Sequence, residues 1–197
     1  MCKQVVDINK YNKIFEVIEK LLEEKDTAVV AIDGGSAAGK TTLAQLLVEK
    51  YNCGVFHMDD FFLPIARRKE GWKEEPAGNI DKERFLEEVL LPISRGEDVE
   101  YHKFDCMRQE ISESVEVKFN KLCIVEGAYS THPSFENYYD LKIFLDVNPD
   151  VQKNRISKRN TPDKQEMFYT IWVPLEKKYF ETFSIKEKCD IVVTIDE

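Results

Sequence analysis

The chain has 197 residues, of which 43% are hydrophobic and 33% charged, a length that suits one soluble globular domain and excludes two complete ones. Its net charge of −9 disfavours a general nucleic-acid binder, and it has neither an apolar run of about 18 residues nor an apolar N-terminal segment, so neither a membrane span nor a secretion signal is expected. The five scattered cysteines form no CxxC pair, which argues against a zinc site or a disulfide framework and predicts a reducing, cytoplasmic location.

The pattern of apolar residues predicts strands that alternate with helices. An amphipathic helix is expected over residues 7–25, because apolar side chains recur there at helical spacing. Five short apolar runs are typical of strands covered on both faces: 27–32, 54–58, 122–125, 141–147 and 191–195. Further helices are predicted at 81–91, 149–159 and about 162–183, and Pro174 is expected to kink or divide the last one. The alternation predicts a three-layer α/β domain with a mainly parallel, five-stranded sheet.

One insertion breaks this alternation. Hydrophobicity alternates over residues 98–105 and again over 113–119, around a polar centre. Such a pattern predicts a β-hairpin, at about residues 97–119, that projects from the sheet.

A phosphate-binding loop follows the first predicted strand and precedes a helix. The pattern GxxxxGK[ST] is complete in Gly34, Gly35, Ser36, Ala37, Ala38, Gly39, Lys40 and Thr41, and Thr42 follows in the helix. Small residues let backbone N–H groups surround a β-phosphate, Lys40 reaches the β- and γ-phosphates, and the Thr41 hydroxyl binds Mg²⁺. These residues predict ATP and Mg²⁺ as cofactors and a P-loop NTPase fold.

Two further segments supply the carboxylates that such a site needs. Glu126 ends a predicted strand and is a candidate to hold Mg²⁺ with Thr41. Asp59 and Asp60 follow another strand, at the sheet edge where ligands bind, and Asp59 is placed to accept a proton from an acceptor hydroxyl or to help bind the metal. His57 fits packing or hydrogen bonding better than catalysis.

The motifs AIDGGSAAGKTTLA, HMDDFFLP, PAGNIDKERF, IVEGAYS and RISKRN together resemble the uridine kinase branch of the phosphoribulokinase/uridine kinase family. The similarity runs from about residue 27 to 190. It implies a single P-loop kinase domain over 1–197 that phosphorylates a nucleoside 5′-hydroxyl with ATP and Mg²⁺. By this resemblance Asp59 is the general base, Glu126 the metal-associated carboxylate and Asp81 the acid that binds the ribose hydroxyls; Asp81 fits a plain helix N-cap equally well.

A basic stretch and the hairpin complete the expected site. Residues 151–164 contain five cationic side chains against one acid, which fits the lid of such kinases, with Arg155 and then Arg159 as the candidates to stabilise the transferring phosphoryl group. In the pyrimidine-nucleoside enzymes the hairpin presents a Tyr-Asp pair and a later His, whereas here Phe104 replaces the tyrosine and no later His appears. His102 is a candidate to replace that His, and the alternation of the strand places it equally well on the solvent face. The base that the protein recognises therefore stays open.

Three alternatives remain at this point. One is a kinase of the same fold that acts on pantothenate, nicotinamide riboside, a nucleoside monophosphate or a sugar phosphate, and the cations Arg67, Arg68 and Lys69 would suit a phosphorylated acceptor. Another is a nucleotide-binding regulatory protein without turnover. A GTP switch is disfavoured, because the guanine-reading pattern [NT]KxD is absent: Asn120-Lys121 continues as Leu122-Cys123. A small-molecule acceptor is the expected partner, with no nucleic acid and no membrane, and the sequence does not determine the oligomeric state.

Overall fold

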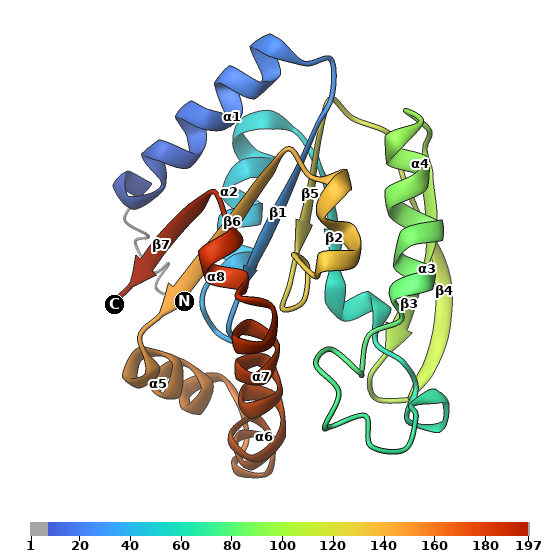
Figure 1. Ribbon diagram of the computed structural model, residues 1–197, viewed down its shortest axis with the longest axis vertical. Coiled ribbons are helices and arrows are strands. Elements are labelled where there is room, and N and C mark those ends of the chain that lie inside the picture. The colour runs from blue at the N-terminus through green and yellow to red at the C-terminus, as the bar shows by residue number, and fades with distance from the viewer. Residues whose placement is uncertain (1–7, 197) are drawn as a thin grey trace.

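A computed structural model describes residues 8–196. Its centre is a sheet of five parallel strands in the order β2-β5-β1-β6-β7 (Figure 1). The strands are β1 (Ala28–Gly34), β2 (Gly54–His57), β5 (Leu122–Glu126), β6 (Leu141–Val147) and β7 (Ile191–Ile195). All five predicted strands are confirmed. Their apolar runs show little alternation because helices cover both faces of the sheet.

Helices cover the two faces with separate apolar cores. On one face, α1 (Asn12–Glu24) and α2 (Lys40–Tyr51) bury residues such as Ile18 and Leu43 against β1 and β6. The opposite core includes side chains from α3 (Lys82–Phe85), a π-helical turn (Leu86–Leu90), α4 (Leu91–Ser94), a 3₁₀ segment (Pro133–Tyr138), α7 (Val173–Phe183) and α8 (Ile185–Lys188). The three-layer architecture is therefore confirmed.

The predicted N-terminal helix is present from Ile8 onward. It begins as a 3₁₀ turn (Ile8–Tyr11) and continues as α1 to Glu24, one residue short of the predicted end. Residue 7 lies outside the described residues. Tyr11, Ile14 and Ile18 are buried, which is what the helical spacing of the apolar residues indicated.

The chain after β6 runs through α5 (Pro149–Arg159), α6 (Pro162–Met167), a π-helical turn (Phe168–Trp172) and α7, below the carboxyl ends of the strands in Figure 1. Pro174 does divide the long predicted helix, but the chain stays helical through the division. A proline ring cannot donate a hydrogen bond and crowds the carbonyl one turn earlier, and the wider turn that precedes α7 relieves that crowding. Pro92 in α4 follows the π-helical turn 86–90 in the same way.

The hairpin consists of β3 (Val99–Asp105) and β4 (Glu110–Val117), an antiparallel pair separate from the main sheet. The predicted hairpin is therefore confirmed, although its second arm begins at Glu110 rather than at 113. Its first strand also packs on the core: the Tyr101 ring lies 5.4 Å from the Phe61 ring and 6.0 Å from the Phe56 ring. The apolar side chains of a lone hairpin need such cover.

No helix within residues 8–196 combines the length and the apolar character that crossing a membrane requires. The four cysteines in this part of the chain (Cys53, Cys106, Cys123 and Cys189) are free thiols.

Candidate active site

The phosphate-binding loop connects β1 to α2 and has the backbone shape that its small residues allow. Gly34 has φ +141°, and a Cβ atom there would lie 2.5 Å from the Leu145 carbonyl oxygen, so only glycine fits. Gly39 has φ +102° and directly precedes α2. The Lys40 ammonium donates hydrogen bonds to the carbonyls of Gly34 (2.8 Å) and Gly35 (3.0 Å), so the loop curves around its own lysine.

A cleft of about 1130 Å³ opens beside this loop. It is lined by the loop and the start of α2, by residues at the carboxyl ends of β5 and β7, by Asp59, and by side chains of α5, the π-helical turn and α7. The residues predicted from the sequence that line it are Ser36, Ala37, Ala38, Gly39, Lys40, Thr41, Thr42, Asp59, Glu126, Arg155 and Arg159. The tertiary structure therefore brings most of the candidate residues to one edge of the sheet.

Glu126 lies at the centre of this arrangement. It is the last residue of β5, its relative exposure is 5%, and the Thr41 hydroxyl donates a hydrogen bond to it at 3.1 Å. The following Gly127 has φ +142°, and a Cβ atom there would lie 2.7 Å from the Met58 Cβ, so glycine lets the two strand ends approach. A hydroxyl and a carboxylate side by side are oxygen donors of the kind that Mg²⁺ prefers, and these residues fit a magnesium ion shared with nucleotide phosphates.

His57 contacts the same carboxylate. Its Nδ1 lies 2.6 Å from Glu126 Oε1, and this hydrogen bond raises the pKa of His57. The hydrogen-bonded role expected for His57 is confirmed. His57 and Thr41 thus contact the same carboxylate oxygen, Oε1.

Asp59 is accessible to solvent at the wall of the cleft. Desolvation by the surrounding protein raises its pKa, and the nearby carboxylates of Glu126 and Asp60 act in the same direction, while the Lys40 charge opposes them. Asp60 has a different role, because its carboxylate accepts a hydrogen bond from the Tyr101 hydroxyl at 3.0 Å. Of the two adjacent acids, one faces the cleft and the other connects this turn to the hairpin.

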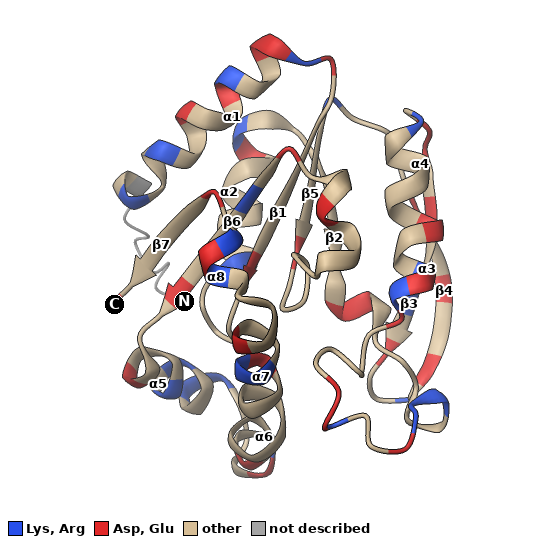
Figure 2. Ribbon diagram, viewed as in Figure 1, with Lys and Arg blue, Asp and Glu red and all other residues tan. Residues whose placement is uncertain are grey.

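The basic stretch lies on α5, where Lys and Arg gather in Figure 2. Arg155 Nη1 donates to the carbonyls of Ala37 (3.0 Å) and Ala38 (3.3 Å), so this guanidinium is already seated on the phosphate loop. Lys158 and Arg159 line the cleft beyond it. The cations of α5 therefore border the cleft next to the loop.

The two predicted substrate residues are not among those that line this cleft. Asp81 is the N-cap of α3, accepts a hydrogen bond from the Arg84 backbone N–H at 3.2 Å, and lies between Arg67 (3.6 Å) and Arg84 (3.7 Å). The N-cap interpretation of Asp81 is thus confirmed, and its contact with a ribose stays a prediction.

His102 lies on the exposed face of β3, 3.6 Å from Glu88, while Tyr101 and Phe104 face the core. The ladder between β3 and β4 shifts its register between His102 and Phe104. Such a bulge changes the alternation of inward and outward side chains, which a sequence pattern cannot foresee. The structure therefore does not bring His102 together with the other candidates.

Aromatic rings line part of the cleft, and Phe62 and Trp172 are two of them. The rings of Phe62 and Trp172 are stacked with their centres 6.2 Å apart, and Trp72 lies 6.3 Å from Trp172. Arg68 lies over the Trp72 ring at 4.4 Å. Phe104 meets Phe62 edge to face. Trp72 lies in an irregular loop, where the sequence has no periodicity that would indicate its position.

Glu176 was also missed. It lies on the buried face of α7, lines the cleft, and bonds to the phosphate-loop residue Ser36. The available signal was an acid at a position where helical spacing, between Trp172 and Tyr179, predicts an apolar residue.

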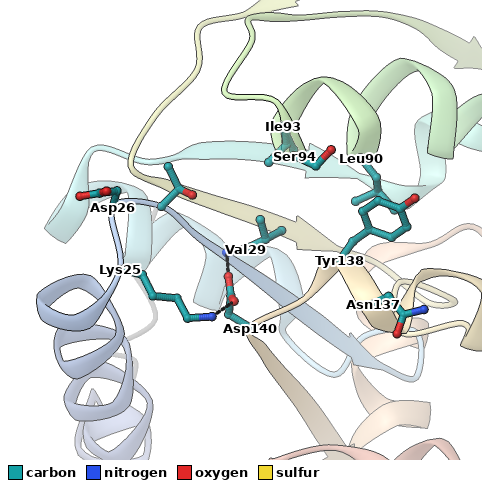
Figure 3. Close-up of a pocket in the computed structure, with 10 residues that line it drawn as sticks. Lys25, Asp26, Val29, Leu90, Ile93, Ser94, Asn137, Tyr138 and Asp140 are labelled. Carbon is teal, nitrogen blue, oxygen red and sulfur yellow. Dashed lines mark hydrogen bonds and ion pairs between the residues drawn. The ribbon is translucent and has the colours of Figure 1, made fainter.

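A second cavity, of about 490 Å³, lies at the opposite edge of the sheet, where Lys25, Val29, Leu90 and Tyr138 surround it (Figure 3). Asp140 accepts hydrogen bonds there from Lys25 Nζ (2.5 Å) and from the Val29 backbone N–H (2.8 Å). This carboxylate is thus satisfied within the protein, and the cavity is far along the strands from the phosphate loop. We assign the candidate active site to the larger cleft.

Comparison with known proteins supports the same assignment. No model of a known protein family matches the chain. Human nicotinamide riboside kinase 2 is 32% identical over 160 residues, which cover 77% of this chain and 66% of that protein. Uridine kinase-like protein 3 of Arabidopsis thaliana is 24% identical over 192 residues, or 89% of this chain and 41% of that protein. The chain thus spans less than half of the plant relative and just under two thirds of the human one.

Among solved structures, a possible uridine kinase from Bacillus stearothermophilus superposes with a TM-score of 0.66 at 20% identity, over 93% of this chain and 100% of that one. This likeness establishes the fold. The expected resemblance to uridine kinases and the expected P-loop kinase fold are both confirmed.

Proposed function

We propose that this chain, a relative of uridine and nicotinamide riboside kinases with a P-loop kinase fold, transfers the γ-phosphoryl group of ATP to the 5′-hydroxyl of a nucleoside. The observation that carries the proposal is the shared cleft: the phosphate loop, the Thr41–Glu126 pair, Asp59 and the cations of α5 all face it. A protein that only binds a nucleotide needs the loop but has no need of a carboxylate such as that of Asp59 beside it, so this residue favours a kinase.

In this proposal the loop holds the ATP phosphates. Backbone N–H groups at the start of α2 would provide a positive end for anions, and Lys40 would exchange its carbonyl partners for the β- and γ-phosphates. Arg155 hydrogen-bonds to the loop itself, Arg159 lines the same cleft, and both would neutralise charge on the transferring group. Closure of α5 over the cleft would exclude water, which prevents wasteful hydrolysis of ATP.

Thr41 and Glu126 would hold Mg²⁺, with Asp59 close by as a further oxygen donor. The metal would neutralise the phosphate oxygens and align the nucleotide for in-line transfer. His57 and Thr41 both hydrogen-bond to Oε1 of Glu126, so this ligand would be oriented before the metal arrives.

Asp59 would act as the general base. An acceptor hydroxyl within hydrogen-bond reach would give its proton to this carboxylate as the phosphoryl group arrives. A raised pKa strengthens Asp59 as a base.

The acceptor is a nucleoside in this proposal, and the aromatic rings of Phe62 and Trp172 suit a flat base. Asp81 remains the proposed partner of the ribose hydroxyls, although the structure places it outside the residues that line the cleft. Two bases are candidates. Uracil is favoured by the resemblance of the motifs, and nicotinamide is favoured by the 32% identity to the human relative, the higher of the two identities. We expect the reaction to take place in the cytoplasm, because scattered cysteines without a CxxC pair are typical of proteins in a reducing compartment.

The test is ADP release from ATP and Mg²⁺ with a panel of uridine, cytidine, nicotinamide riboside, pantothenate, nucleoside monophosphates and sugar phosphates. We expect release that depends on one nucleoside and is lost in Lys40→Ala. A response to pantothenate or a sugar phosphate instead would refute the nucleoside part of the proposal. ATP binding without release for any acceptor would favour a regulatory protein.

A further inference from the structure

Helix α7 carries a buried carboxylate that the proposed reaction does not use. Glu176 has a relative exposure of 5%, and both of its oxygens accept hydrogen bonds from one residue of the phosphate loop. The Ser36 backbone N–H donates to Oε2 at 2.9 Å, and the Ser36 hydroxyl donates to Oε1. A buried carboxylate is stable only with such partners, so the pair forms a specific link between α7 and the loop.

No basic side chain in the described part of the chain forms an ion pair with Glu176. The nearby Lys40 donates its hydrogen bonds to loop carbonyls instead. Burial raises the pKa of Glu176, and the Lys40 charge acts in the opposite direction. Ser36 is therefore the hydrogen-bonding partner of this carboxylate, and the link does not depend on an ion pair.

Other contacts hold the same part of the loop. Gln152 of α5 donates to the Ser36 carbonyl at 2.9 Å, so Ser36 is held through its N–H, its hydroxyl and its carbonyl. One turn beyond Glu176, the Tyr179 hydroxyl donates to Asp33 at 3.0 Å, and Asp33 accepts the Gly34 N–H at 2.7 Å. Residues three apart lie on one face of a helix, so one face of α7 contacts the loop at two points.

The loop needs this support because of its backbone conformation. Ala37, directly after Ser36, has φ +63°, a left-handed conformation that costs a non-glycine residue about 1 kcal/mol or more. Residues in alternating right- and left-handed conformations turn successive N–H groups toward one point, which forms a concave site for an anion. Contacts that fix the Ser36 peptide would keep that site formed.

We propose that Glu176 is a positioning residue for the nucleotide: by holding Ser36 through its N–H and hydroxyl, it keeps the phosphate loop in its anion-binding shape. The inference rests on the proposed function, since it assumes that ATP phosphates occupy the loop. It differs from a catalytic role, because Glu176 touches the loop and need not touch the reacting atoms. Loss of Glu176 should therefore weaken binding of the nucleotide more than binding of the acceptor.

The test measures the dissociation constant of ADP by calorimetry with Mg²⁺ and no acceptor, together with KM for ATP, KM for the acceptor and kcat. Glu176→Ala removes two hydrogen bonds to a charged group, and we expect nucleotide binding to weaken about tenfold to a hundredfold. Glu176→Gln keeps one acceptor oxygen and should restore most of the lost affinity. Neither variant should change KM for the acceptor appreciably.

Two further variants separate positioning from general damage. Glu181→Gln is the matched control, since Glu181 lies on the same helix, is exposed and pairs only with Lys177 at 3.7 Å; it should bind ADP as the native chain does. Ser36→Ala removes one of the two bonds, so its effect should largely disappear in the Glu176→Ala background.

Native-like ADP binding by Glu176→Ala would overturn the inference, and so would additive effects of Ser36→Ala and Glu176→Ala. If Glu176→Ala does not fold, Glu176→Met, which fills the same space without an acceptor oxygen, provides the same cycle with Ser36→Ala. Absence of ADP binding by the native chain would instead refute the proposed function.

Discussion

Replacing Asp59 with asparagine tests the proposed chemistry most directly. Asparagine keeps the size of the side chain and its place at the wall of the cleft but cannot accept a proton. A positioned base contributes about 10²–10⁴ to the rate, so kcat should fall by that factor, which corresponds to about 3–5 kcal/mol in the activation free energy.

The same substitution should leave the affinity for the nucleotide unchanged or raise it. The Asp59 carboxylate interacts with the Lys40 charge and lies beside the proposed phosphate site. Removing its negative charge lessens repulsion of the phosphates, so the dissociation constant of ADP should stay the same or decrease. A lower kcat with undiminished nucleotide affinity is the signature of a lost base, whereas a damaged cleft would weaken both.

The assay is steady-state ADP release with the acceptor found in the panel, alongside calorimetric ADP binding. Asp60→Asn is the matched control, because its amide oxygen can still accept the Tyr101 hydroxyl bond that the carboxylate accepts. It should retain most of the native turnover. The pH profile adds a second readout: a base must be ionised, so kcat should decrease as the pH falls through the raised pKa of Asp59, above the ordinary value of 3.8. Turnover of Asp59→Asn within tenfold of the native rate would refute the assignment.

Three further predictions concern stability. Gly127→Ala places a Cβ atom 2.7 Å from the Met58 Cβ in a backbone conformation that alanine resists, and thermal unfolding should show a loss of at least about 2 kcal/mol. Tyr179→Phe removes a hydrogen bond from the buried Asp33 carboxylate and should lower the free energy of unfolding by about 1–3 kcal/mol in urea titrations. An unchanged free energy of unfolding would contradict this prediction, because it would mean that the other donors satisfy Asp33 on their own. Burial lowers the pKa of His132 to about 4, so the unfolded chain binds a proton that the folded chain resists, and stability should decrease as the pH falls from about 6.5 towards 4. His132→Asn, which cannot titrate, should reduce that slope in unfolding measurements at a series of pH values.

Some of the site could be predicted because its chemistry lies in consecutive residues. The phosphate loop occupies residues 34–41, and its glycines, Lys40 and Thr41 act through the local backbone. Asp59 and Glu126 were predicted nearly as directly. Each follows or ends a parallel strand, and the carboxyl ends of neighbouring parallel strands meet at one edge, as the pairing of His57 with Glu126 shows.

Other residues could not be placed because their position depends on contacts between distant segments. The bulge in β3 reverses the alternation after His102 and turns Phe104 inward, and it arises from pairing with β4 rather than from local preference. Trp72 reaches Trp172 across 100 positions of the chain, and its loop has no periodicity to read.

The sequence by itself determined the fold class, the parallel strands, the phosphate loop and its carboxylate partners, because each follows from short-range periodicity or from a motif whose parts are adjacent. Only the tertiary structure decided which face of the hairpin meets the core, which aromatic rings line the cleft, and that Glu176 of α7 holds Ser36. The packing of α7 on the end of β1 joins residues 140 positions apart, and no local pattern in the chain encodes that contact.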